Sequence, residues 1–260
     1  MRQMKASPIY LRAIGEAALS GVRIDEGPAE IMLKEFGRYL DDAPGFAREV
    51  LGATLYPFQD RVLASLSSGK AVAVRSCHGP GKTATDAMAV LWFLATRFPA
   101  RVPCTAATYP QLSSILWPEC ARWMRSTRLE RHLEWTATMI RLRGAEEEHF
   151  AIARSAAKGE NISGFHAPHL LYIVDEASGV PDHIMEAVDG ALTTEGAKIL
   201  MTGNPTKRSG RFFRVFHQER AMWTLFHVGP GDSPQVSKAW VENMRRKYGE
   251  ASPVYLVRAL

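Results

Sequence analysis

Hydrophobic residues recur at two different spacings along this chain, and the spacing changes near residue 70. Before that point apolar residues recur every three or four positions over 9–19 and 28–40, as on one face of a helix. Residues 41–45, Asp-Asp-Ala-Pro-Gly, form a turn signal after the second of these stretches. The pattern therefore predicts a helical subdomain, or lid, over residues 1–55.

After residue 70, short apolar runs alternate with longer stretches of helical spacing. The short runs have the length and composition of buried strands, and we expect strands at 71–74, 102–108, 139–143, 149–153, 170–174, 198–202 and 223–228. Helices are expected at 83–98, 110–129, 181–192, 211–217 and 236–248. Strands and helices in turn are typical of an α/β fold with a mostly parallel sheet flanked by helices. We assign this core to residues 56–230 and further C-terminal helices to residues 231–260.

Composition narrows the class of protein without naming a function. The 260 residues are 46% hydrophobic and 23% charged, values that exclude disorder for most of the chain. The formal charge of +5 permits a polyanionic partner. Three cysteines without a Cys-x-x-Cys pair exclude a disulfide framework and favour a reducing compartment. The longest apolar run, 87–95, is shorter than the roughly 20 residues that span a bilayer, so no membrane partner is expected.

The strongest chemical motif follows the first expected strand and opens the next helix. It reads Ser-Cys-His-Gly-Pro-Gly-Lys-Thr, the order and context of a phosphate-binding P-loop. Loop N–H groups and the helix N-terminus would hold phosphates, Lys82 would reach the β- and γ-phosphates, and the Thr83 hydroxyl would bind Mg²⁺. The residues expected to contact the nucleotide are Ser76, Cys77, His78, Gly79, Pro80, Gly81, Lys82 and Thr83. Ser76 stands where the motif has glycine, and a glycine-rich turn with an incidental Lys-Thr is the alternative.

A second motif ends the apolar run 170–174, where Asp175 and Glu176 follow directly. In P-loop enzymes such a strand lies beside the phosphate loop. Asp175 would then hold Mg²⁺, and Glu176 would act as general base toward the attacking water. The alternative is a solvated strand end.

Two further segments bear on the same site. The strand at 198–202 leads into Gly-Asn-Pro, so Thr202 and Asn204 would meet the γ-phosphate or the water at the carboxyl edge of the sheet, unless the segment is an ordinary turn. Upstream, Gln59 can offer a donor and an acceptor to the adenine edge, and Tyr56 or Phe58 could stack on the base. The alternative there is a helix-start glutamine beside core aromatics.

In this order, these segments resemble the ATPase domain of the large terminase, the DNA-packaging motor of tailed bacteriophages. The resemblance covers roughly residues 50 to 230 and is carried by 56–59, 77–83, 105–111, 162–168, 173–177 and 201–205. Helicases and many other NTPases share the phosphate loop and the acidic strand. The Ser-Gly-Phe-His and Thr-Gly-Asn-Pro stretches narrow the match to terminase-like proteins.

The resemblance implies a P-loop NTPase core of the RecA-like, additional-strand (ASCE) kind that hydrolyses ATP with Mg²⁺. It implies a homo-oligomeric ring in the host cytoplasm, docked on the portal protein of a procapsid and pumping double-stranded DNA inward. A small terminase subunit is the implied partner in recognising the DNA. A ribonuclease H-like nuclease domain follows in such proteins; we expect it to be absent from this chain, and nuclease activity is not expected.

The resemblance also implies an arginine that stabilises transition-state charge. Arg75, near the phosphates, and Arg154, acting in trans, are the candidates, with Arg101 as a third option. For each, a solvated surface arginine is the alternative.

Basic residues that could meet DNA phosphates gather in three places. They are the segment 207–220, the run 245–247, and the series Arg122, Arg125, Arg128 and Arg131, which would form a loose stripe on one helix. Solvated faces, or contacts to a neighbouring subunit, are the alternatives. At the level of the whole chain, a superfamily 2 helicase-like DNA translocase and a nucleotide-gated DNA-binding or assembly module with little turnover stay open beside the packaging ATPase.

Overall fold

The computed structural model describes residues 27–69, 71–155 and 165–259. The helix expected at 9–19, and the Ile-Ser-Gly residues that begin the stretch 162–168, lie outside the described residues.

The sheet has eight strands in the order β3-β4-β5-β2-β6-β7-β1-β8. The strands are β1 (Ala71–Ser76), β2 (Ala100–Ala106), β3 (Leu133–Trp135), β4 (Met139–Leu142), β5 (Phe150–Ser155), β6 (His169–Asp175), β7 (Lys198–Gly203) and β8 (Thr224–Val228). The six strands from β5 to β8 in this order are parallel, and β3 and β4 add an antiparallel edge. The expected α/β fold with a mostly parallel sheet is confirmed. Only β3, three residues long, is missing from the strands that the sequence predicts.

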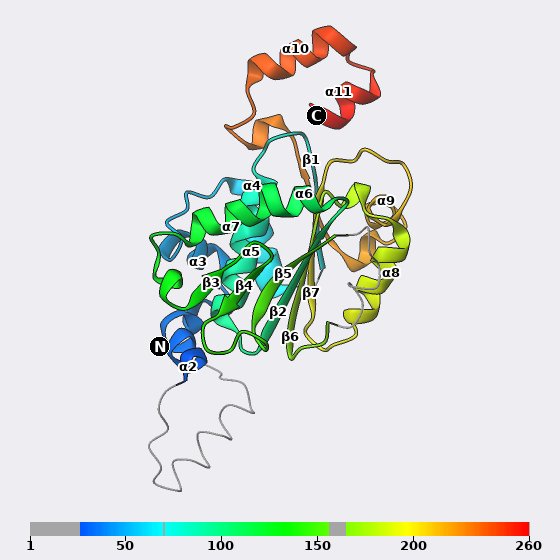
Figure 1. The fold of residues 1–260 in the computed structure, drawn as a ribbon. Helices are drawn as coiled ribbons and strands as arrows, with labels where there is room; N and C mark the ends of the chain where they lie inside the picture. Colours follow the sequence, from blue (N-terminus) through cyan, green and yellow to red (C-terminus); the bar gives the residue numbers. More distant parts are fainter. Residues whose placement is uncertain (1–26, 70, 156–164, 260) are drawn as a thin grey trace, which may run out of the picture.

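Helices cover both faces of the sheet (Figure 1). On one face lie α2 (Pro28–Phe36), α3 (Ala43–Glu49), α4 (Pro57–Ser68), α5 (Lys82–Thr96) and α7 (Trp117–Met124); on the other lie α8 (Asp182–Ala191) and α9 (Arg211–Val215). The helix predicted over 28–40 is confirmed as α2 followed by a 3-10 turn (Gly37–Tyr39), whereas α3 was not predicted and begins inside the expected turn 41–45. They share one hydrophobic core with α5, and the division of the chain at residues 55 and 230 stays a prediction.

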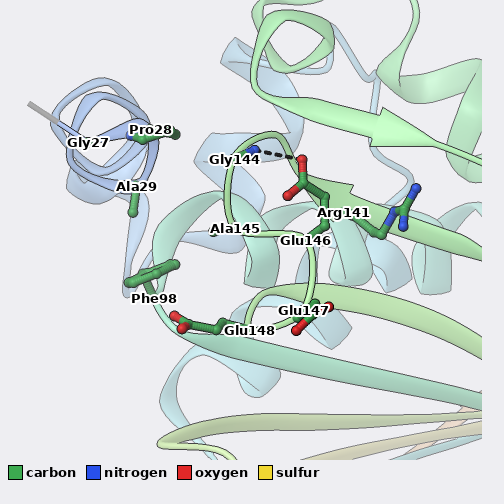
Figure 2. Close-up of a pocket in the computed structure, with 10 residues that line it drawn as sticks. All are labelled: Gly27, Pro28, Ala29, Phe98, Arg141, Gly144, Ala145, Glu146, Glu147 and Glu148. Atoms are coloured by element: carbon green, nitrogen blue, oxygen red, sulfur yellow. Dashed lines mark hydrogen bonds between the residues drawn. The ribbon is translucent and has the colours of Figure 1, made fainter.

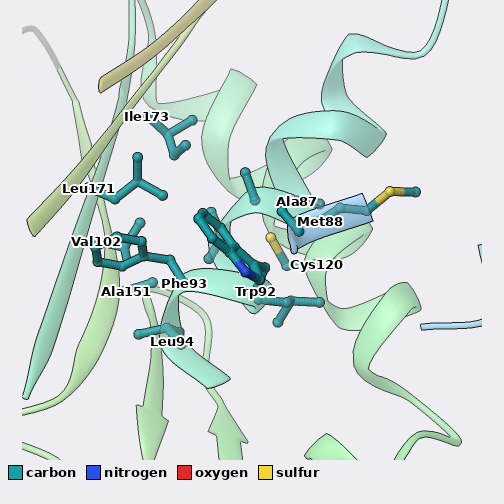
Figure 3. Close-up of a cluster of buried hydrophobic side chains, with 14 of the residues drawn as sticks. Ala87, Met88, Trp92, Phe93, Leu94, Val102, Cys120, Ala151, Leu171 and Ile173 are labelled. Atoms are coloured by element: carbon teal, nitrogen blue, oxygen red, sulfur yellow. The ribbon is translucent and has the colours of Figure 1, made fainter. Parts of the chain in front are cut away.

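The central helix is α5, which is apolar on all sides because the sheet and the other helices enclose it. Figure 3 shows Trp92 and Phe93 of this helix among residues of β2 and β6. The Trp92 indole N–H donates to the Tyr39 carbonyl at 2.7 Å, which attaches the N-terminal helices to α5. The start of α5 is thereby fixed against the sheet, and that start is where the phosphate loop ends.

The single helix expected over 110–129 is wrong. The structure has the short α6 (Tyr109–Gln111), a π-helical turn (Leu112–Leu116), α7, and a 3-10 turn (Arg128–Arg131). Pro118 opens α7, and a proline cannot donate to the preceding turn, which interrupts regular helix there. Arg125 leaves helical geometry at the end of α7 (ψ 142°), so the four arginines of the expected stripe do not share a helix face.

The chain ends in α10 (Lys238–Tyr248) and α11 (Pro253–Arg258), which lie beyond the end of β1 at the top of Figure 1. C-terminal helices were expected over 231–260, and their presence is confirmed. Within the described ranges, no helix is long and apolar enough to cross a membrane.

Candidate nucleotide site

The phosphate loop spans residues 77–81 between β1 and α5, as the motif predicts. Gly79 (φ +74°) and Gly81 (φ +108°) both take left-handed backbone angles that glycine adopts without strain. The loop is tied to its surroundings: Cys77 N donates to the Val228 carbonyl at 2.9 Å, and Gln59 Nε2 donates to the Gly81 carbonyl at 3.1 Å. Its backbone is therefore held open in a fixed shape.

Lys82 is 6% exposed and joins three of the predicted motifs. Its Nζ donates to Ser76 Oγ at 3.0 Å and to Asn204 Oδ1 at 3.1 Å, and lies 3.7 Å from Glu176 Oε1. Asn204 Nδ2 in turn donates to the Ser76 carbonyl at 2.7 Å. Ser76, the departure from the glycine of the motif, thus supplies a hydroxyl that holds the lysine.

The acidic strand β6 does not pair with β1, because β7 lies between them. Alternation of side chains along the strands still brings the motifs together. Ser76, Asp175 and Asn204 lie on the same sheet face as the core residues that precede them in alternate positions and pack against α5. Glu176 has a left-handed backbone (φ 47°), and its N–H donates to Asp175 Oδ1 at 2.9 Å. A non-glycine residue in this conformation is uncommon and is found at functional sites.

Asp175 is 3% exposed. Burial first, and the charge of Glu176 second, raise the pKa of the Asp175 carboxyl to about 6. The Thr202 hydroxyl lies 3.4 Å from Asp175 Oδ1. A proton or a cation in this position therefore relieves an unfavourable negative charge.

Asp86 is a site residue that the sequence interpretation missed. It is fully buried in α5, and its Oδ2 accepts from the Thr202 hydroxyl at 2.7 Å. Burial, followed by the nearby Asp175, raises its pKa well above the usual value. The signal was present, because an aspartate four residues after Lys82, inside a run of apolar residues, lies on the same helix face as that lysine.

Gln59 lies at the loop, but its amide is already engaged. Its Oε1 accepts from Tyr56 N at 3.0 Å while its Nε2 donates to Gly81, so its observed role is to clamp the loop. Of the two aromatic candidates for base stacking, Phe58 is 1% exposed within the core. Tyr56 is half-buried beside Gly81 and is the one whose ring is accessible.

The other loop residues keep the positions that the motif gives them. Cys77 is buried, which raises the pKa of its thiol and disfavours the thiolate. His78 and Gly79 are exposed, Pro80 is buried, and Thr83 stands half-buried in the first turn of α5.

The candidate arginines do not meet the loop within one chain. The Arg75 guanidinium lies 5.1 Å from the Phe216 ring centre, on the opposite sheet face from Ser76. Arg154 is on β5, separated from β1 by β2, β6 and β7, so an action of Arg154 in trans stays a prediction. Arg101 is the second residue of β2, at the opposite sheet edge from the loop, and donates to the His166 carbonyl at 3.0 Å.

Much of the basic charge expected to meet DNA is paired within the chain. In the segment 207–220, Arg211 and Arg214 both bind Glu219, at 2.8 and 3.3 Å, and Arg214 also binds Asp182 at 2.8 Å. Lys207, Arg208 and Arg220 are exposed. Elsewhere, Arg122 pairs with Glu119, Arg128 with Glu35, and Arg245 and Arg246 with Glu242.

One cavity is remote from this chemistry. It measures about 600 Å³ and lies between the start of α2 and the turn joining β4 to β5 (Figure 2). That turn precedes β5, so the cavity is at the opposite edge of the parallel strands from the phosphate loop. Glu146, Glu147 and Glu148 line it, and Glu146 accepts from Gly144 N at 2.7 Å. In the described part of the chain no group of three His, Cys, Asp or Glu residues could hold a metal ion.

Comparison with known proteins agrees with this architecture. No protein-family model matches the chain. The chain is 28% identical over 216 residues to a probable terminase large subunit of Enterobacteria phage P7, a match that covers 77% of this chain and 44% of that protein. It therefore spans less than half the length of that curated relative.

Comparison with solved structures also finds similarity to large terminases. The ATPase domain of the large terminase of Thermus phage P74-26 matches with a TM-score of 0.60 at 18% identity, covering 78% of this chain and 92% of that one. A large terminase from a thermophilic bacteriophage matches with a TM-score of 0.62 at 16% identity, covering 80% of this chain and 53% of that one. The fold is similar to that of large terminase ATPase domains, which agrees with the predicted α/β fold of a mostly parallel sheet flanked by helices.

Proposed function

We propose that this chain is the ATPase motor domain of a phage large terminase, which hydrolyses Mg-ATP to move double-stranded DNA into a procapsid. The observation that carries the proposal is the convergence on Lys82 of Ser76, Glu176 and Asn204, from segments far apart in the sequence. A buried ammonium held by these groups is a preformed site for phosphate oxygens. Support also comes from the large terminase of the thermophilic bacteriophage, which has been solved in complex with ADP and with ATP-γ-S.

Each residue then has a role that its position allows. Loop N–H groups and Lys82 bind the phosphates. Glu176, whose side chain is 34% exposed and lies at the edge of the site, takes the proton of the attacking water. Asn204 senses the state of the nucleotide, since its side chain holds Lys82 and its N–H lies 3.4 Å from Glu176 Oε2.

The donor set fits Mg²⁺, which takes oxygen ligands and keeps several waters. Thr83 and Asp175 would hold the ion, and burial and the charge of Glu176 outweigh Lys82 in raising the pKa of Asp175, so a bound cation would stabilise its ionised form. When bound, Mg²⁺ neutralises charge on the phosphates. Asp86 accepts a hydrogen bond from Thr202 and would thereby hold the end of strand β7 beside the Asp175 carboxylate.

The first test compares phosphate release with nucleotide binding. We expect Glu176→Gln to lower turnover by about 10²–10⁴-fold, the range for loss of a general base, while ATP binding persists. Lys82→Ala should lose binding. Glu147→Gln, which neutralises an exposed carboxylate far from the loop, is the matched control. Normal turnover in Glu176→Gln would exclude the assigned base.

The second test addresses assembly and DNA. Because neither Arg75 nor Arg154 reaches the loop within one chain, we propose that a neighbouring copy in a homo-oligomeric ring supplies the arginine, with Arg154 as the candidate. Turnover per chain should then rise steeply with protein concentration and further with double-stranded DNA. Turnover near zero at all concentrations, with ATP bound, would instead favour a nucleotide-gated module. Portal protein, small terminase and a host-cytoplasmic location belong to the same proposal.

A further inference from the structure

Three side chains meet at Gly81, the last residue of the phosphate loop, and one of them comes from the C-terminal part of the chain. Around the position that a Gly81 Cβ would occupy lie Gln59 Nε2 at 3.1 Å, Gln235 Oε1 at 3.5 Å and Tyr56 Cε2 at 3.9 Å. Tyr56 and Gln59 belong to the start of α4, and Gln235 follows β8. No motif in the sequence points to Gln235.

Gln235 lies on the other side of β1 from the reacting groups. Glu176 and Asn204 follow β6 and β7, on one side of β1, whereas the segment that carries Gln235 follows β8, on the other, and α4 packs across β7, β1 and β8. A nucleoside triphosphate whose γ-phosphate lies at Lys82 and Glu176 must extend its nucleoside away from them. That direction leads toward Tyr56 and Gln235.

Because Gln59 is used to hold the phosphate loop, its amide is not free to hydrogen-bond the base of a bound nucleotide. Both heavy atoms of the Gln59 amide already serve the protein. The Gln235 amide is exposed, and no hydrogen bond joins its side chain to another described residue. A free amide offers one donor and one acceptor side by side, which matches the N1 and amino group of adenine. Tyr56 adds a ring face for stacking.

Gln235 is also held in place, as a recognition residue must be. Its N–H bonds to Ser233 Oγ at 3.2 Å, and both Ser233 (3% exposed) and Val236 (8% exposed) are buried beside it. The C-terminal segment is attached to the phosphate loop at two amides, Cys77 N to the Val228 carbonyl and His78 N to the Arg258 carbonyl, both at 2.9 Å. The wall that carries Gln235 is thus anchored on both sides.

We infer that Gln235 is a specificity residue for the base of the bound nucleotide, and that the segment after β8 forms one wall of the base pocket with Tyr56 opposite. The inference rests on the proposed function, because it uses the same phosphate loop. It extends that function by naming a determinant of adenine against guanine. Guanine presents an acceptor oxygen and an N1–H donor where adenine has a donor and an acceptor, so the Gln235 amide discriminates between them when the bound base and Tyr56 hold it in one orientation.

The experiment measures ADP, GDP and inorganic pyrophosphate binding by titration calorimetry on the full chain, together with the KM and kcat for ATP. Gln235→Ala should weaken ADP binding about tenfold, the effect of losing one to two hydrogen bonds, with GDP changed less. Pyrophosphate, which has no base, should bind as to the wild type. The KM for ATP should rise while kcat stays within about twofold.

Two variants complete the design. Gln235→Asn keeps the amide and should restore part of the preference for ADP, while Gln218→Ala, an exposed glutamine beyond α9, should change nothing. Equal weakening of ADP, GDP and pyrophosphate would show that Gln235 only supports the loop, and unchanged ADP binding would overturn the inference. If the wild type bound ADP but released no phosphate, the proposed hydrolysis would fail, and the base preference would still be measured.

Discussion

The buried carboxylate Asp175 is predicted to make the nucleotide-free protein less stable than it would be with a neutral residue there. The side chain is 3% exposed, and its pKa is raised from 3.8 to about 6 by burial and by Glu176. Asn has nearly the same shape, and its oxygen can still accept the N–H of Glu176. We therefore expect Asp175→Asn to be more stable than the wild type at neutral pH and inactive in hydrolysis.

The size of the effect follows from the shift in the Asp175 pKa. Between pH 3.8 and about 6 the folded chain keeps this proton and the unfolded chain has lost it, so the free energy of unfolding falls as pH rises through that window. A shift of about two units corresponds to about 3 kcal/mol. The free energy of unfolding of the variant should thus exceed that of the wild type by about 2–3 kcal/mol at pH 8, where the wild type has lost all of this stability, and by little near pH 4.

The assay is urea unfolding of both proteins between pH 4 and 8, with EDTA to remove divalent cations. The measured quantity is the difference in the free energy of unfolding between the two proteins, because the pH-dependent contribution of His149 to stability is the same in both. Burial lowers the pKa of His149 to about 3, so its contribution is lost as pH falls below 6.5 in either protein. The exposed-carboxylate control Glu147→Gln should show no such difference. A gain that does not depend on pH, or a loss at pH 8, would refute the electrostatic argument.

Three further predictions concern the loop and its surroundings. Thr202→Val removes the hydroxyl that Asp86 accepts at 2.7 Å, and should lower the free energy of unfolding in urea by about 1–3 kcal/mol. Gly81→Ala puts a Cβ at φ +108° within 3.1 Å of a clamp atom, and should weaken ADP binding measured by calorimetry. Lys207→Ala with Arg208→Ala should weaken double-stranded DNA binding and reduce the slope of log K against log salt by about 2, as expected for two lost phosphate contacts.

Each of these has a matched control and a contradicting outcome. Thr202→Ser keeps the hydroxyl, loses only the methyl group and should stay near wild-type stability; a larger loss in Thr202→Ser than in Thr202→Val would show that methyl packing, and not the hydrogen bond to Asp86, stabilises this position. Gly196→Ala is also at positive φ (+78°) but in open space, and should spare ADP binding. Arg246→Ala with Lys247→Ala removes two charges from α10, and an equal loss of DNA binding there would show a general charge effect.

The sequence predicted the fold and the ends of the strands better than the contacts between side chains. Parallel strands with polar residues at their carboxyl ends place Lys82, Asp175 and Asn204 at one edge, and the structure agrees. Alternation along β1 also explains why Arg75 lies away from the phosphate loop. Neighbouring residues of a strand point to opposite faces of the sheet, so Arg75 must face away from α5 if Ser76 faces toward it. The salt bridges of Arg211 and Arg214 join α9 to α8, and no spacing rule reports such pairs in advance.

The strand β7 connects the proposed nucleotide site to the protein surface. Its tip carries Thr202, which bonds Asp86, and Asn204, which bonds Lys82. The hydroxyl groups of Thr206 and Ser178, 2.7 Å apart, then join the segment after β7 to the turn that follows Glu176. The exposed Lys207 and Arg208 come next in the chain. Under the proposed function, a change in the contacts of Asn204 on phosphate release would occur three residues from these exposed cations, a short path by which hydrolysis would be coupled to movement of a bound polyanion.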